Sequence, residues 1–206
     1  MEPKWLEWAK RIRAISQSGL AYTRDAYDAE RYEKLRQIAG EIISEHSKLD
    51  SQRLAELFSE NIGYATPKVD VRGTAFRGDM ILMVKEREDG GWTLPGGWAD
   101  VCESPSENVI KEIREESGLE TCVLKLAAVY DRSKHPHRPL MIDHIYKFFF
   151  ICEIIGGEAK RGSETEDVGF FGEDELPELS ISRVTVGQIK GMFAHIRNLN
   201  MPTDFD

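Results

Sequence analysis

The chain has 206 residues, 41% of them hydrophobic, which suffices for one medium domain or for one domain with a small appendage. Its formal net charge of −9 disfavours general binding to the anionic backbone of DNA or RNA. The longest apolar run, residues 148–152, is far too short to cross a membrane, and acidic residues near the start of the chain argue against a signal peptide.

Three cysteines, Cys102, Cys122 and Cys152, lie far apart in the sequence. Their spacing matches no zinc-binding pattern, and their odd number does not suggest a disulfide framework. We therefore expect free thiols in a cytoplasmic protein.

Residues 1–62 carry a helical pattern. Apolar residues recur at steps of three and four in the first segment, as at Trp5, Trp8 and Ile12, and Gly19 is expected to end this helix. We interpret the stripe as core or as a dimer contact. The alternative is that the two tryptophans bind a nucleobase or a choline cation.

Similar patterns predict a second helix over residues 28–46 and a third over residues 51–60. The pattern changes after Pro67, where short apolar runs separated by turn residues replace the helical periodicity. The sequence therefore predicts a small all-helical N-terminal domain, residues 1–64, and a second domain, residues 65–206.

The second domain is predicted to contain a mixed sheet with a helix on each side. The expected strands cover residues 69–76, 80–84, 121–130, 141–155 and 168–171. Turns are expected at residues 77–79 and 89–91, a flexible loop at 156–167 and a final helix at 184–198.

Residues 96–119 read as a loop, a helix and a second loop. Ser104 suits the N-cap, Pro105 suits the first helical position, and Glu107 completes a capping box. Gly118 has the conformational freedom that a helix C-terminus requires. This local chemistry predicts a helix with defined ends.

Glu112, Glu115 and Glu116 fall on one side of this helix, because their spacings are three and four residues. Carboxylates this close repel one another unless a cation neutralises them, and hard oxygen ligands suit Mg²⁺ or Mn²⁺. Taken alone, the three glutamates are equally compatible with a solvated acidic helix face.

The positions around these glutamates resemble the Nudix box, a motif with fixed spacing. The matching residues are Gly97, Glu103, Lys111, Glu112, Ile113, Glu115, Glu116, Gly118 and Leu119. One position departs, since Lys111 stands where the family has arginine, and lysine cannot form a bidentate fork with a carboxylate. The resemblance implies α/β class: a Nudix α/β/α sandwich with a mixed sheet, preceded by the helical domain.

The resemblance also implies a metal site with Mg²⁺ as the expected ion and Mn²⁺ as a substitute. Its implied ligands are Glu112, Glu115, Glu116 and the backbone carbonyl of Gly96. Glu103, Lys111 and Gly97 are implied to stabilise the loop, with Glu103 held through Lys111. Catalytic roles are implied for Glu115 and Glu116.

A distal carboxylate in the 156–167 loop is implied to act as the general base. Glu164 is the first choice and Glu166 the second, while a solvated surface is the alternative for each. A basic loop at residues 131–139 supplies weaker candidates for substrate binding: Arg132, His135, His137 and Arg138. For this loop a solvated turn is an equal alternative, and a metal site at the two histidines is a weaker one.

The reaction implied by the resemblance is hydrolysis of the pyrophosphate bond in a nucleoside diphosphate linked to a group X. The N-terminal helices resemble a subfamily that includes CDP-choline and ADP-ribose pyrophosphatases. We place CDP-choline first, giving CMP and phosphocholine. The alternatives are ADP-ribose, giving AMP and ribose 5-phosphate, an RNA 3′-end exonuclease activity at the same metal site, and a catalytically silent ligand-sensing Nudix protein.

The resemblance implies a homodimer. We expect neither DNA nor a membrane as a partner, and RNA is not favoured because the chain is acidic.

Overall fold

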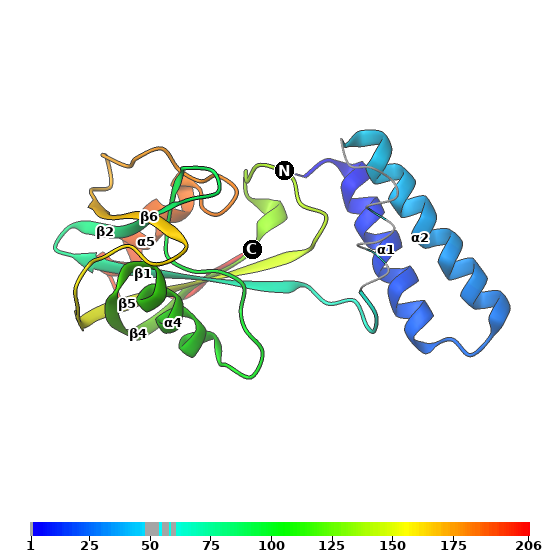
Figure 1. The fold of residues 1–206 in the computed structure, drawn as a ribbon, viewed down its shortest axis with the longest axis horizontal. Helices are drawn as coiled ribbons and strands as arrows, with labels where there is room; N and C mark the ends of the chain where they lie inside the picture. The colour runs from blue at the N-terminus through cyan, green and yellow to red at the C-terminus, as the bar shows by residue number, and fades with distance from the viewer. Residues whose placement is uncertain (1, 48–53, 55–57, 59–60) are drawn as a thin grey trace. The chain divides into compact units, whose positions relative to one another are not determined.

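The computed structural model describes residues 2–47, 54, 58 and 61–206 (Figure 1). The chain forms two compact units. One comprises Met1–Pro67 together with Met141–His144, and the other comprises Lys68–Leu140 together with Ile145–Asp206. Each unit has its own buried core.

Two helices, α1 (Lys4–Tyr22) and α2 (Ala26–His46), pack side by side in the first unit (Figure 1). The side chain of Asp25 caps α2 by accepting a hydrogen bond from the Asp28 backbone N–H at 2.9 Å. The unit's buried apolar residues are Leu6, Ala9, Ala39, Ile43, Leu54 and Phe58. The two predicted helices are confirmed, and the predicted helix at residues 51–60 lies largely outside the described residues.

Gly19 does not end α1, contrary to the prediction. A Cβ at this position would lie 2.4 Å from the ring of Tyr32, so glycine is needed for close packing of α2. The helix continues for three residues and ends at Tyr22.

The stripe predicted for the first helix is only partly buried. Ala9 is buried and Trp5 stacks on His46 at a ring distance of 4.8 Å, whereas Trp8 and Ile15 are 54% and 58% exposed. The side of α1 that faces the core therefore includes Leu6 and Ala9. It leaves Trp8 and Ile15 of the predicted stripe at the surface.

The strand predicted for residues 141–155 begins later, at Ile145. Residues Met141–His144 belong to the helical unit, where Ile142 packs on the core. Arg13 forms an ion pair with Asp143 at 3.4 Å and donates a hydrogen bond to the Ile142 carbonyl at 3.5 Å. These contacts explain why the segment leaves the sheet.

Seven strands form one sheet in the described part of the second unit. They are β1 (Lys68–Arg77), β2 (Met80–Glu86), β3 (Trp92–Thr93), β4 (Leu119–Asp131), β5 (Ile145–Gly157), β6 (Thr165–Phe171) and β7 (Asp204–Phe205). The order is β3-β2-β1-β5-β4-β7, with β6 paired to β2. The β1–β5 and β4–β7 pairs are parallel and the others antiparallel, so the predicted mixed sheet is confirmed.

The loop predicted at residues 156–167 is shorter than expected. Strand β5 continues to Gly157 and β6 begins at Thr165, so Glu166 lies within a strand. Glu164 remains in the loop, directly before β6.

Helix α4 (Pro105–Ser117) and helix α5 (Val186–Arg197) cover opposite faces of the sheet. Val109 and Ile113 of α4 pack in one buried cluster with Val71, and Phe193 of α5 packs in the other with Phe149. This arrangement confirms the predicted α/β/α sandwich, which the two N-terminal helices precede in the sequence.

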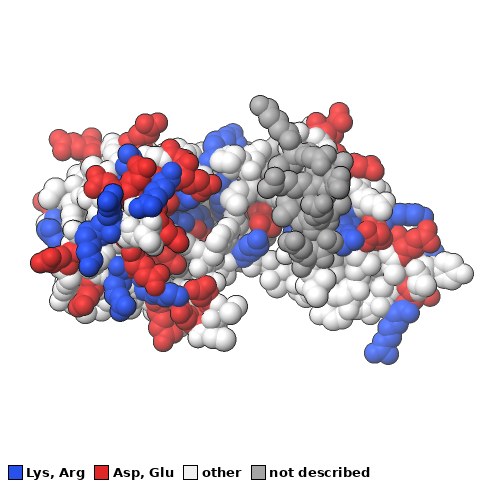
Figure 2. All heavy atoms as spheres, viewed as in Figure 1, with Lys and Arg blue, Asp and Glu red and all other residues white. Residues whose placement is uncertain are grey.

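On the face of the sheet unit that Figure 2 presents, acidic and basic side chains are interspersed. Among the described helices, none has the length and the apolar run needed to cross a bilayer.

Cys102, Cys122 and Cys152 are free thiols, as expected.

Candidate active site

Helix α4 forms as its local sequence predicts. The Ser104 hydroxyl accepts a hydrogen bond from the Glu107 N–H at 3.3 Å, and the Glu107 carboxylate accepts one from the Ser104 N–H at 2.8 Å. Gly118 ends the helix with a φ of 72°. The capping box is confirmed, and it gives the glutamates of this helix a rigid frame.

The loop before α4 is hydrogen-bonded to the backbone of strand β1. The Val71 N–H donates to the Gly97 carbonyl at 2.9 Å, and the Gly73 N–H donates to the Pro95 carbonyl at 2.8 Å. Gly96 between them has a φ of 138°, and a Cβ there would lie 2.0 Å from the Val71 carbonyl oxygen. Only glycine fits this close approach of two backbones.

Glu116 is buried beside this loop, with 8% of its surface exposed. Its Oε2 accepts a hydrogen bond from the Gly96 N–H at 2.9 Å. Burial raises the pKa of Glu116 to about 8, and Glu112 adds to the rise, whereas Arg72 and the Gly96 N–H oppose it. In the metal-free protein this carboxylate therefore binds a proton near neutral pH.

Glu112 is half-buried one helical turn away. A Cβ on Gly97 would lie 3.4 Å from Glu112 Oε1, so this carboxylate lies against the loop. Burial raises the pKa of Glu112 to about 7, Glu115 and Glu164 contribute by repulsion, and Arg72 opposes the rise. The structure thus brings Glu112 and Glu116 together at the loop that contains Gly96.

Three further acidic candidates differ in position. Glu115 and Glu164 are exposed, and both interact electrostatically with Glu112. Glu166 instead forms an ion pair with Lys85 at 3.0 Å. Of the two distal carboxylates, Glu164 is thus the one whose charge acts on Glu112.

Lys111 of α4 bridges two carboxylates of the preceding loop, those of Asp100 and Glu103. Its Nζ donates to Asp100 Oδ2 at 2.7 Å and to Glu103 Oε1 at 3.2 Å, and these bonds raise its pKa. Asn108 adds a third tie, since its Oδ1 accepts a hydrogen bond from the Asp100 N–H at 2.6 Å. A lysine can therefore bridge two carboxylates here without the bidentate fork of an arginine.

The basic loop is anchored within its own unit. It includes a 3₁₀ turn, η1 (Arg132–Lys134), and the buried Arg132 donates through Nη2 to the Pro139 and Ser182 carbonyls at 2.9 and 3.3 Å. His135 Nε2 lies 3.2 Å from Asp206 Oδ1. Arg138 is exposed at the end of the loop.

His137 is 2% exposed, and both of its ring nitrogens are engaged. Nδ1 lies 2.9 Å from the Ile181 carbonyl oxygen, and Nε2 lies 3.1 Å from Gln188 Nε2. Burial lowers the pKa of His137 to about 3, so the ring is neutral and donates to Ile181 while it accepts from Gln188. These bonds join the basic loop to α5.

Comparison with known proteins identifies the family of this fold and site. A family model described as the NUDIX domain matches residues 66–187. The chain belongs to the Nudix hydrolases. A second family model, described as a UDP-X-like N-terminal oligomerisation domain, matches residues 3–58. The predicted family and enzyme class are therefore confirmed.

Two of three similar proteins match this Nudix hydrolase over nearly its whole length. The "Putative ADP-ribose pyrophosphatase YjhB" of Bacillus subtilis is 45% identical over 100% of this chain and 99% of its own length. A solved UDP-X diphosphatase is 35% identical, with a TM-score of 0.64 and 98% of each chain covered. An ADP-ribose pyrophosphatase from Streptococcus suis is 40% identical, with a TM-score of 0.63, and covers 68% of this chain and 100% of its own.

Nudix hydrolases generally use divalent metal ions, and the donors in this Nudix box suit such an ion. Glu112 and Glu116 have raised pKa values that a nearby cation would lower. Glu103 Oε2 is buried without a hydrogen-bond partner in the described structure, as expected for an oxygen that faces a cation or its water shell. Within the described residues, no three acidic, His or Cys side chains already converge on one point.

Three buried charges of this Nudix hydrolase escaped the sequence analysis. Asp70 and Arg72 on β1 and Lys147 on β5 are 6%, 4% and 2% exposed. Burial alone would raise the pKa of Asp70, but the charges of Arg72 and Lys147 lower it to about 2. Burial lowers the pKa of Lys147 to about 8. For Asp70 and Arg72 the sequence signal was a polar residue at every second position of the first half of β1.

Removing metal should make the stability of this Nudix hydrolase depend on pH. The folded pKa values of Glu112 and Glu116, about 7 and 8, exceed the ordinary value of 4.5. Their stabilising contribution is complete below about pH 4.5 and is lost as the pH rises through 7 and 8. In EDTA we expect the free energy of unfolding to fall by about 2 kcal/mol between pH 6.5 and pH 8, which lowers Tm by roughly 4–8 °C.

Within this window the two glutamates account for most of the expected change. His137 is neutral in the folded state and, with its ordinary pKa of 6.5, titrates at the lower edge of the window in the unfolded state, whereas the folded pKa of Lys147, about 8, lies at the upper edge. Thermal unfolding followed by circular dichroism is the measurement, and Glu116→Gln should flatten the slope by more than half. An equally steep slope in that variant would contradict the assignment.

Proposed function

We propose that this Nudix hydrolase cleaves the pyrophosphate bond of a nucleoside diphosphate linked to a group X, giving a nucleoside monophosphate and phospho-X. The observation that carries the proposal is the juxtaposition of Glu116, Glu112 and the Gly96 loop, where buried carboxylates lie beside a backbone free of side chains. Such a site suits a substrate with two phosphoryl groups bridged by hard cations.

The residue roles follow from position and charge. We assign Glu112, Glu115, Glu116 and the Gly96 carbonyl to hold Mg²⁺, with Mn²⁺ as a substitute. A bound ion neutralises phosphate oxygens and lowers the pKa of water. Glu164 takes the proton from the attacking water, because its charge acts on Glu112 while Glu166 is paired with Lys85.

The names of the relatives bear on the identity of X. ADP-ribose is favoured because the Bacillus subtilis relative and the Streptococcus suis structure both carry that substrate in their names, whereas the solved structure that covers both units is named a UDP-X diphosphatase. CDP-choline, which the N-terminal helices suggested, is the second candidate. The adenine and cytosine compounds share the pyrophosphate on which the proposed site acts.

A product assay with Mg²⁺ tests this function. The substrates are ADP-ribose, CDP-choline, a UDP-sugar and a short RNA, and products are separated by chromatography. Metal-dependent release of AMP from ADP-ribose would support the first candidate, and release of CMP from CDP-choline would support the second. Release of nucleotides from RNA alone, or no metal-dependent product, would contradict the proposal.

We also propose that the protein is a homodimer assembled through α1. The matched family model is described as an oligomerisation domain, and α1 has apolar side chains at intervals of seven residues. Trp8, Ile15 and Tyr22 are 54%, 58% and 70% exposed, which leaves a row of apolar side chains, spaced by two turns, along one side of this helix. A second copy of the chain is the partner that this stripe fits.

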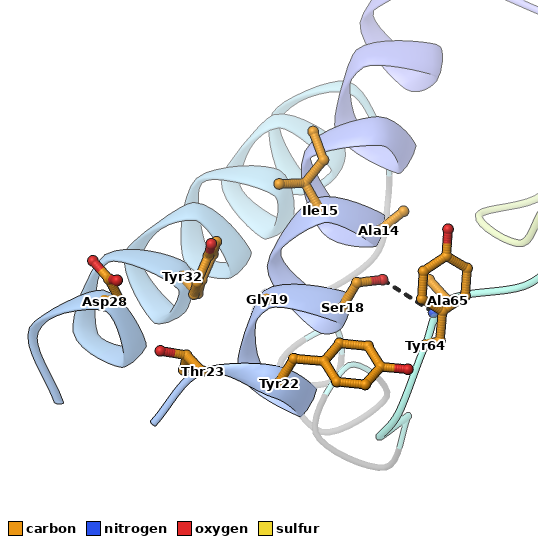
Figure 3. Close-up of a pocket in the computed structure, with 10 residues that line it drawn as sticks. All are labelled: Ala14, Ile15, Ser18, Gly19, Tyr22, Thr23, Asp28, Tyr32, Tyr64 and Ala65. Carbon is orange, nitrogen blue, oxygen red and sulfur yellow. Dashed lines mark hydrogen bonds between the residues drawn. The ribbon is translucent and has the colours of Figure 1, made fainter. Parts of the chain in front are cut away.

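A pocket partly lined by Ile15 and Tyr22 of this stripe opens on the same unit. It has a volume of about 650 Å³ and is lined by Ala14, Ile15, Ser18, Gly19, Tyr22, Thr23, Asp28, Tyr32, Tyr64 and Ala65 (Figure 3). The Tyr22 and Tyr64 rings lie 6.5 Å apart, and the Ser18 hydroxyl accepts a hydrogen bond from the Ala65 N–H at 3.2 Å. An apolar side chain of the partner could enter this pocket.

Ile15→Glu should weaken the dimer at least about tenfold, since burying an unpaired charge in an apolar interface costs more than 1.4 kcal/mol. Ile15 is 58% exposed within the single chain, so the fold should persist. Mass measurement by light scattering across a dilution series gives the dimer affinity. The matched control is Ile155→Glu, at 63% exposure in the sheet unit, and equal behaviour of the two variants would refute the assigned face.

A further inference from the structure

We propose that Arg72 is a positioning residue for the metal-binding carboxylates. It fixes the loop whose Gly96 N–H holds Glu116, and it does so through the Leu94 carbonyl. This inference rests on the proposed function, because it concerns the same carboxylates.

Arg72 is itself held rigidly from within the sheet. Asp70 and Arg72 point to the same side of β1, two residues apart, and Asp70 is the register partner of Lys147 on β5. Asp70 Oδ1 accepts from Arg72 Nε at 3.0 Å and Oδ2 accepts from Nη2 at 2.7 Å. Lys147 Nζ donates to Asp70 Oδ1 at 2.5 Å. The guanidinium is thereby locked in one plane.

The other end of the guanidinium contacts the loop. Arg72 Nη1 donates to the Leu94 carbonyl at 3.2 Å, two residues before Gly96. The Gly96 N–H then donates to Glu116 Oε2 at 2.9 Å. A continuous set of bonds thus connects the buried Asp70 with the carboxylate at the candidate metal site.

The charge of Arg72 acts in the same place as these bonds. Its positive charge lowers the pKa of both Glu112 and Glu116, although it is 4% exposed and already engaged with Asp70. A lysine at this position would keep the charge, but its ammonium lacks the planar fork that spans both Asp70 oxygens and the Leu94 carbonyl. Geometry and charge can therefore be separated by substitution.

The test measures Mn²⁺ affinity directly, by electron paramagnetic resonance at pH 8.5 without substrate. Arg72→Met removes both the bonds and the charge, whereas Arg72→Lys removes the bonds and keeps the charge. A positioning role predicts that both variants bind Mn²⁺ about 10- to 100-fold more weakly, as is typical when an outer-shell partner of a ligand is lost. The matched control is Arg77→Met, the same substitution at an exposed position of β1.

Two other results would overturn the proposal. If Arg72 acts only by repelling cations, Arg72→Met will bind Mn²⁺ more tightly and Arg72→Lys will match wild type. If Arg72 serves stability alone, Tm will fall in both variants while the Mn²⁺ affinity stays unchanged. Should Arg72→Met fail to fold, Arg72→Lys decides, because it keeps a cation beside Asp70.

The proposed function is judged separately, from the wild-type protein. Wild-type protein that binds Mn²⁺ and hydrolyses a nucleoside diphosphate derivative, with variants of unchanged affinity, would overturn only the role of Arg72. Wild-type protein that neither binds Mn²⁺ nor turns over a substrate would overturn both proposals.

Discussion

Replacing Glu116 with glutamine will lower kcat at least about 10²-fold, because loss of a charged metal ligand forfeits part of the several kcal/mol of transition-state stabilisation that a bound ion supplies. Glutamine keeps the size of the side chain and its ability to accept a hydrogen bond from the Gly96 N–H, but it loses the negative charge. Because the buried carboxylate of Glu116 has a raised pKa, the neutral variant should be at least as stable as wild type in EDTA.

Steady-state kinetics over a range of Mg²⁺ concentrations, with thermal unfolding of the same samples, measures both effects. Glu120→Gln is a suitable control, because Glu120 is exposed on β4 and its substitution changes the net charge by the same amount. Near-normal turnover by Glu116→Gln at saturating Mg²⁺ would show that the metal site is elsewhere.

Gly96→Ala will destabilise the protein by about 3 kcal/mol or more, through strain at a backbone conformation reserved for glycine and through a steric clash. The added Cβ would lie 2.0 Å from the Val71 carbonyl oxygen, so the loop must separate from β1. For a chain of this length the loss corresponds to a fall in Tm of roughly 6–12 °C. Activity should fall as well, because Glu116 loses its partner.

Gly78→Ala provides the matched comparison. Gly78 also has a positive φ, 60°, but nothing lies within 4 Å of its added Cβ, so it reports the cost of the backbone conformation alone. Differential scanning calorimetry gives both values. If the two variants lose equal stability, the close contact between the Gly96 loop and β1 is absent in solution.

Local chemistry explains which parts of the fold could be predicted from sequence. The ends of α4 depend on Ser104, Glu107 and Gly118, which lie within one helix and act over a few residues. The turns predicted at residues 77–79 and 89–91 are equally local, and the structure has turns at residues 78–79 and 87–90, so the first is confirmed and the second begins two residues earlier than predicted. The glutamates that project from α4 share this advantage, because helical geometry fixes their spacing.

Contacts between distant residues explain what could not be predicted. Asp70 and Lys147 meet through parallel pairing of β1 and β5, which no local pattern reveals. His137 could be a substrate ligand or part of a turn until its two ring contacts are known. The role of Gly19 likewise depends on a ring of another helix. Sequence patterns identify residue types, whereas tertiary pairing decides whether they are buried.

The segment Met141–His144 affects when the helical unit can be completed during synthesis and how it can be replaced by recombination. The helical unit is discontinuous in sequence, because Ile142 and Asp143 complete contacts that begin in α1. During synthesis the first unit therefore remains incomplete until most of the second has left the ribosome. In recombination, the N-terminal helices can be replaced intact only if these four residues of the later chain are replaced with them.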